Sequence, residues 1–139
     1  MTERHVSVDA LRSMMAKANE KLSAARRELS ADYPGEAASC SYYAVFHALS
    51  AVLATEGKSF SSHAQTLGAF NREFVKTGLF PADTTRKLQR LFEDRQMADY
   101  DWATSVDAPT AADDVNDADM IIKTCEAYLA KTTVGYAKL

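Results

Sequence analysis

A cation, a carboxylate and a phenol fall within six positions of this chain, at Arg95, Asp99 and Tyr100 in the run RQMADYD. The apolar residues before them recur at helical spacing: Leu88, Leu91 and Phe92. At about 100° of rotation per residue, Arg95 falls in the middle of this stripe and Asp99 returns to nearly the same side one turn later. We expect the stripe to face the core. Because a buried charge is costly without a partner, Arg95 and Asp99 form either a structural ion pair or the floor of a site.

A second polar group lies on the apolar segment upstream, where Tyr43 and His47 are four positions apart, with Ser39 and Ser50 on the same flank. One interpretation is a core pair in which Tyr43 and His47 satisfy each other by hydrogen bonding. The other is that His47 lines the same pocket as Arg95, where it would bind phosphate or move protons.

A further histidine, His63, begins the apolar face of a short helix close to its N-terminus, where unpaired backbone N–H groups favour anions. Three histidines without carboxylates at ligand spacing argue against a metal site. The five glycines form no phosphate-binding loop, and no serine or cysteine stands in a nucleophile elbow. We therefore expect no metal and no cofactor.

The composition is that of one compact domain over residues 1–139, with 47% hydrophobic residues. Cys40 and Cys125 lie in helical patterns without metal-type spacing, which predicts reduced thiols in a cytoplasmic protein. The N-terminal run MTERHVSVDALR lacks the apolar core of a signal peptide, and no apolar run approaches the roughly 20 residues that span a bilayer.

The charge of the chain limits its partners. A net charge of −3 argues against bulk electrostatic binding of nucleic acid, although local sites remain open. We interpret the basic group of Arg86, Lys87 and Arg90 as a solvated helix face.

Helical periodicity covers almost the whole sequence. It predicts a first helix from about Ser7 to Ser30 and a second, central helix from Pro34 to near Gly57. A capping box of Ser62 and Gln65 opens a short helix that Gly78 closes.

Pro81 is expected to start the helix that carries Arg95. After a loop at about Trp102 to Pro109, a capping box of Thr110 and Asp113 opens the last helix. Its inner face is predicted to hold Val115, Ala118, Ile122, Cys125 and Leu129. No stretch alternates like a strand, so the predicted fold is all-α: an up-and-down four-helix bundle with one short extra helix between the second and third long helices.

These residues also resemble a known family. The matching run is SYYAVFHALSAVLATEGKSFSSHAQTLGAFNREFVKTG followed by RQMADYD, over about Glu36 to Asp101. It is similar to the HEPN domain family, specifically its small stand-alone bacterial and archaeal members. The most specific features are YYAVFHAL, the Ser-Ser-His helix start, REFVKTG and the Arg-containing ADYD ending.

The resemblance implies functions that spacing alone does not show. Many HEPN proteins resemble one another as metal-independent ribonucleases, in which an Arg is followed after four to six residues by a His, and two such motifs meet across a homodimer. Stand-alone members are often paired with a small nucleotidyltransferase that serves as antitoxin, and the domain is also thought to bind nucleotides. Arg95 matches the motif Arg, but Tyr100 stands where the His is expected.

Three interpretations follow from this departure. In the first, the protein is a nonhydrolytic module that binds a nucleotide or RNA through Arg95, Asp99, Tyr100, Tyr43, His47 and His63, beside a nucleotidyltransferase partner. In the second, it is a toxin-like endoribonuclease with Arg95 and Tyr100 as catalytic residues. In the third, the charged pair is purely structural in a dimerising bundle. An unperturbed Tyr is a poor general base at neutral pH, which favours binding over cleavage.

Overall fold

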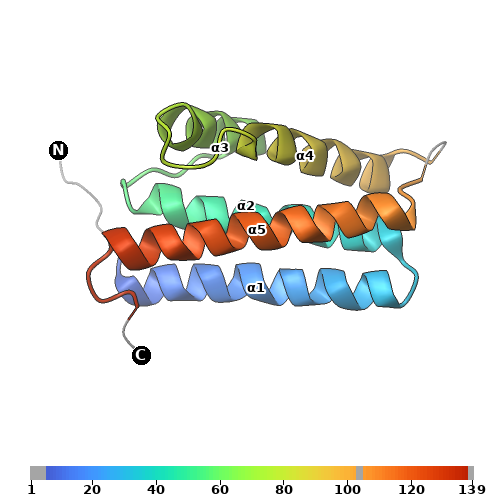
Figure 1. The fold of residues 1–139 in the computed structure, drawn as a ribbon, viewed down its shortest axis with the longest axis horizontal. Helices are drawn as coiled ribbons and strands as arrows, with labels where there is room; N and C mark the ends of the chain where they lie inside the picture. The colour runs from blue at the N-terminus through green and yellow to red at the C-terminus, as the bar shows by residue number, and fades with distance from the viewer. Residues whose placement is uncertain (1–5, 103–104, 138–139) are drawn as a thin grey trace.

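The computed structural model describes residues 6–102 and 105–137 as a bundle of long helices (Figure 1). The elements are α1 (Val8–Ser30), α2 (Pro34–Ala54), α3 (His63–Phe70), η1 (Asn71–Val75), α4 (Thr84–Tyr100) and α5 (Ala108–Thr132). No strand occurs in these two ranges. The predicted four long helices with a short helix between the second and third are confirmed.

Three helix starts follow the sequence prediction, with α2 beginning at Pro34 as expected, and two differ from it. The hydroxyls of Ser7 and Ser62 cap α1 and α3 as expected. However, α4 begins at Thr84, because Pro81 lies in a turn whose carbonyl accepts a hydrogen bond from Thr84 N. Likewise α5 begins before the predicted box, because the Asp107 carboxylate accepts from Thr110 N and caps the helix. Residues 103 and 104 of the predicted loop, like 1–5 at the N-terminus, lie outside the described residues.

The centre of the bundle is α2, which contacts α1, α3, α4 and α5. Its alanines and valines are buried on several sides, along with Tyr42 and Leu49. By length and composition α2 could cross a membrane, with a mean hydropathy of 1.3, although the sequence analysis expected no such segment. Most of that apolar stretch is covered by the other helices, and its place in the core accounts for its composition.

A π-helical turn separates α3 from the loop that leads to α4. In η1 the chain makes wider turns, closed by the hydrogen bond from Lys76 N to Asn71 O at 2.9 Å. The turn places Phe70 and Phe74 side by side, with ring centroids 5.2 Å apart, in the core.

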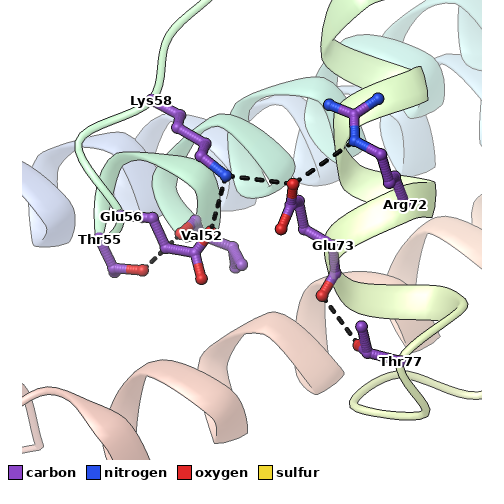
Figure 2. Close-up of polar contacts among 7 residues, drawn as sticks. All are labelled: Val52, Thr55, Glu56, Lys58, Arg72, Glu73 and Thr77. Carbon is purple, nitrogen blue, oxygen red and sulfur yellow. Dashed lines mark hydrogen bonds and ion pairs between the residues drawn. The ribbon is translucent and has the colours of Figure 1, made fainter.

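Ion pairs on the surface join η1 to the end of α2 (Figure 2). Lys58 Nζ lies 3.2 Å from Glu73 and 3.5 Å from Glu56, and Arg72 Nε lies 3.4 Å from Glu73. The hydrogen bond and charge of Lys58 lower the pKa of the Glu73 carboxyl. These contacts link η1 to the loop that follows α2.

Candidate functional site

Arg95 lies on α4 at the border of the core rather than in its middle. Leu88 and Leu91 are buried, but the side chain beneath them in the same stripe is Asp94, which is also buried. Arg95 points instead beside the half-buried Phe92 toward α2, with 11% of its side chain exposed. The prediction that Arg95 lies in the middle of the core-facing stripe is therefore wrong. Asp94 takes that position, and Arg95, one residue later, is rotated from it by about 100° around the helix.

Three side chains hold the Arg95 guanidinium. Nη2 donates to the hydroxyl of Tyr43 at 2.5 Å and to that of Tyr100 at 3.3 Å. Nε lies 3.0 Å from Asp99 Oδ2, but it is buried and makes no aligned hydrogen bond, so this pair is held by charge. No described residue accepts a hydrogen bond from Nη1. The guanidinium is thus oriented yet keeps donors for a ligand.

Aromatic rings surround the same cation. Arg95 Cζ lies 5.4, 5.2 and 5.2 Å from the ring centroids of Tyr42, Tyr43 and Tyr100. Rings at this distance stabilise a cation through their quadrupoles. Burial acts to lower the pKa of Arg95, but the hydrogen bond to Tyr43 and the neighbouring Asp99 carboxylate raise it above its usual value. The site therefore preserves a positive charge.

His63 belongs to this cluster. Its Nδ1 lies 2.7 Å from the Tyr42 hydroxyl, and its ring stacks on Phe46 with centroids 4.1 Å apart. Burial, followed by the charge of Arg95, lowers the pKa of His63, so the ring is neutral near pH 7. Burial also raises the pKa of Tyr42 to about 12, which keeps its hydroxyl protonated.

Tyr42 was missed as a site residue, because its position on the apolar ridge of α2 marked it as core. The signal was nevertheless present, since a buried tyrosine hydroxyl normally finds a polar partner.

His47 lies on a different side of α2. The charges nearest to it are Lys17 and Lys21 of α1, which together with burial lower its pKa. The Tyr43 hydroxyl accepts from Arg95 and is not paired with His47. Of the candidate residues, the structure therefore brings together Arg95, Asp99, Tyr100, Tyr43 and His63, and leaves His47 on the α1 side.

A second charged cluster lies on the other side of α4 and was not predicted. Asp94 is 8% exposed and Asp114 of α5 is fully buried. Arg90 Nε lies 3.4 Å from Asp114, and Arg90 Nη2 contacts Asp117. Arg90 is thus an ion-pair partner rather than part of a solvated face. Burial and the neighbouring Asp94 raise the pKa of Asp114 to about 8, so the two carboxyls share a proton near neutral pH.

Elsewhere the site chemistry is limited. Within residues 6–102 and 105–137, no three His, Cys, Asp or Glu side chains form a group that could hold a metal ion. Cys40 and Cys125 are free thiols. The Arg95 cluster is therefore best suited to an anion: an oriented cation with ring faces beside it.

The fold is a helical bundle with Arg95 on α4, its third long helix, and it is the fold of a known protein family. The model of the HEPN domain matches residues 11–130, and the chain belongs to the HEPN domain family. A Thermotoga maritima protein named "UPF0332 protein" is 49% identical over 59 residues, 42% of this chain and 45% of that protein.

A Methanocaldococcus jannaschii protein named "putative toxin" is 29% identical over 91 residues, 66% of this chain and 62% of that protein. The chain thus matches less than two thirds of the length of either relative.

Proposed function

We propose that this protein is a HEPN module that binds the phosphate of a nucleotide or of RNA at Arg95, within a toxin–antitoxin-like pair. The observation that carries the proposal is the guanidinium itself, which Asp99 and Tyr43 orient while Nη1 has no acceptor among the described residues. A phosphate oxygen is a strong acceptor for such a donor.

Tyr100 supports binding rather than cleavage. In the sequence it stands where the family resemblance expects the motif histidine, its hydroxyl lies 3.3 Å from Arg95 Nη2, and 64% of the residue is exposed. An exposed ring beside a phosphate-binding cation is suited to stacking against a base. Its phenol lacks the basicity that proton abstraction requires near pH 7.

Cleavage of RNA is the second candidate function, and one observation favours it. His63 is neutral near pH 7 and lies in the Arg95 cluster, so a proton acceptor is present although Tyr100 is not one. In that case Arg95 would stabilise the charge of the scissile phosphate, with Tyr100 as a hydrogen-bond donor.

The partners in this proposal come from family membership and the name of the Methanocaldococcus relative. They are a second copy, placed so that two Arg95 side chains face one groove, and a nucleotidyltransferase that acts as antitoxin. A cytoplasmic location is part of the same proposal.

Binding is tested by comparing Arg95→Met with Arg86→Met, since Arg86 is an exposed cation on the same helix. The probes are ATP and a 5′-phosphorylated single-stranded RNA, with thermal shift and fluorescence anisotropy as measurements. We expect Arg95→Met to weaken binding at least tenfold and Arg86→Met to leave it nearly unchanged. Equal effects would show that only general positive charge matters, and the absence of any binding by the wild-type protein would overturn the proposal.

Cleavage is tested with the same RNA. Loss of cutting in both Arg95→Met and His63→Gln, with native circular dichroism, would establish the second function over binding alone. If Arg95→Met only lowers the melting temperature and wild-type protein neither binds nor cuts, the purely structural interpretation holds.

A further inference from the structure

A groove lies where the turn between α1 and α2 meets the end of α4. These segments share one end of the bundle (Figure 1). Its volume is about 420 Å³. One wall comes from Tyr33 and Pro34 and the other from Trp102, with Met97 and Val106 between them. Arg95 is not among its lining residues.

Two aromatic side chains flank this groove while open to solvent. Trp102 is fully exposed and Tyr33 is 59% exposed. Below them lies a small apolar cluster of Ala37, Ala38, Val106 and Ala111, against which Met97 packs. Large aromatic side chains on a surface mark interaction sites, because leaving them in water forgoes their burial.

Carboxylates surround the aromatic pair. Asp32, Glu36 and Asp101 line the groove, and among the described residues no lysine or arginine does. A phosphate backbone would be repelled here, whereas Trp and Tyr faces beside carboxylates are suited to a Lys or Arg side chain. An isologous contact with a second copy would set like charges against each other. The charge therefore favours a basic protein partner.

We propose that the groove of Tyr33 and Trp102 docks a basic segment of a partner protein. A partner Lys or Arg lies over the Trp102 ring, its charge is balanced by Asp32 and Glu36, and its aliphatic stem covers Met97. The groove and the Arg95 cluster then have opposite ligands: a cation-bearing protein at one and a phosphate at the other.

The chain offers its own probe, since Trp102 is its one tryptophan. A short peptide of Arg, Lys and Leu is titrated into the protein, alongside a matched peptide with Glu in place of Arg and Lys. We expect a saturable change in Trp102 emission with the basic peptide and none with the acidic peptide. The double variant Asp32→Asn with Glu36→Gln is expected to weaken binding at least tenfold. Asn tolerates the left-handed backbone of Asp32, whose φ is 67°.

The matched control is Leu79→Ala, since Leu79 is 56% exposed in the turn before α4 and does not line the groove. It should bind the basic peptide like wild type, as should Arg95→Met, which separates this test from that of the proposed function. Equal response to both peptides, or no effect of the double variant, overturns the proposal. An emission change on concentrating the protein alone that persists in Arg95→Met assigns the groove to a second copy. An emission change with single-stranded RNA that persists in Arg95→Met assigns it to nucleic acid, and either result also overturns the proposal.

Discussion

Asp94 and Arg95 are consecutive on α4, yet the negative charge of Asp94 is partly neutralised whereas the positive charge of Arg95 is kept. Asp94 faces α5, where it meets the buried Asp114, and a shared proton removes part of the negative charge. Arg95 faces α2, where Tyr43 and Tyr100 preserve its positive charge at the edge of solvent. A rotation of 100°, one residue along the helix, therefore separates the partly neutralised pair of Asp94 and Asp114 from the cation of Arg95, which a ligand can reach.

The difference indicates which cluster has a structural role. Asp94 and Asp114 each have one buried carboxylate oxygen with no partner while both groups are charged, so a shared proton gives them the hydrogen bond they lack. Neither carboxyl is open to a ligand, and their effect is on how α4 packs against α5. In the Arg95 cluster the Asp99 carboxylate balances the charge of the guanidinium. A ligand can still reach the cluster, because Tyr100 is exposed and the Asp99 side chain is 26% exposed.

The largest expected effect concerns the carboxyl pair and pH. The folded chain holds a proton that the unfolded chain releases near the usual Asp pKa of 3.8, because folding raises the pKa of Asp114 to about 8. The free energy of unfolding should therefore fall by several kcal/mol as pH rises from 4 toward 8, because each pH unit between the two pKa values is worth about 1.4 kcal/mol. Asp114→Asn should remove most of this fall. Urea unfolding at several pH values measures it, and parallel curves for variant and wild type would contradict the shared proton.

The next largest expected effect is a difference in stability between variants of Arg90 and Arg95, both on α4. Arg90→Met removes the cation beside Asp114 and should lower the free energy of unfolding. Because the exposed guanidinium is partly screened, we expect a loss of about 1–2 kcal/mol at pH 9 and a smaller loss at pH 6. Arg95→Met should cost less than about 1 kcal/mol, because Asp99 can turn to water. Chemical unfolding of both variants provides the measurement. A greater loss for Arg95→Met would make its pair the structural one.

The smallest effect is a change in the titration of His63. Arg95→Met removes one of the two causes that lower the pKa of His63, and burial remains. The pKa of His63 should therefore rise but stay below the usual histidine value. His47 is the internal control, because its neighbouring charges are Lys17 and Lys21. NMR titration of the ring protons follows both residues; an unchanged His63 would place it outside the field of Arg95.

The fold was largely predictable because hydrophobic periodicity is a local property of the sequence. Val115, Ala118, Ile122, Cys125 and Leu129 are all buried as expected. The helix starts at Thr84 and Ala108 were less accessible, because more than one residue near each start can cap a helix or begin a turn.

The candidate site was only partly predictable. The spacing of Arg95, Asp99 and Tyr100 along one helix identified three of its members, whereas His63 meets Tyr42 across two helices. Asp94 and Asp114 were overlooked because a carboxyl on an apolar stripe is assumed to point outward. The orientation of α4 about its own axis, which decides between Asp94 and Arg95, depends on packing against α2 and α5 together.

The wide turn of η1 has a consequence for how the family can vary. A π-helical turn contains one residue more than an α-helical turn needs, so deleting a residue between Asn71 and Val75 would leave a regular helix. That deletion would leave α3 at nearly the same rotation about the helix axis relative to Phe74, because the wider turn already absorbs the extra residue. Homologues shorter by one residue here are thus expected to keep the contact between this histidine and Tyr42.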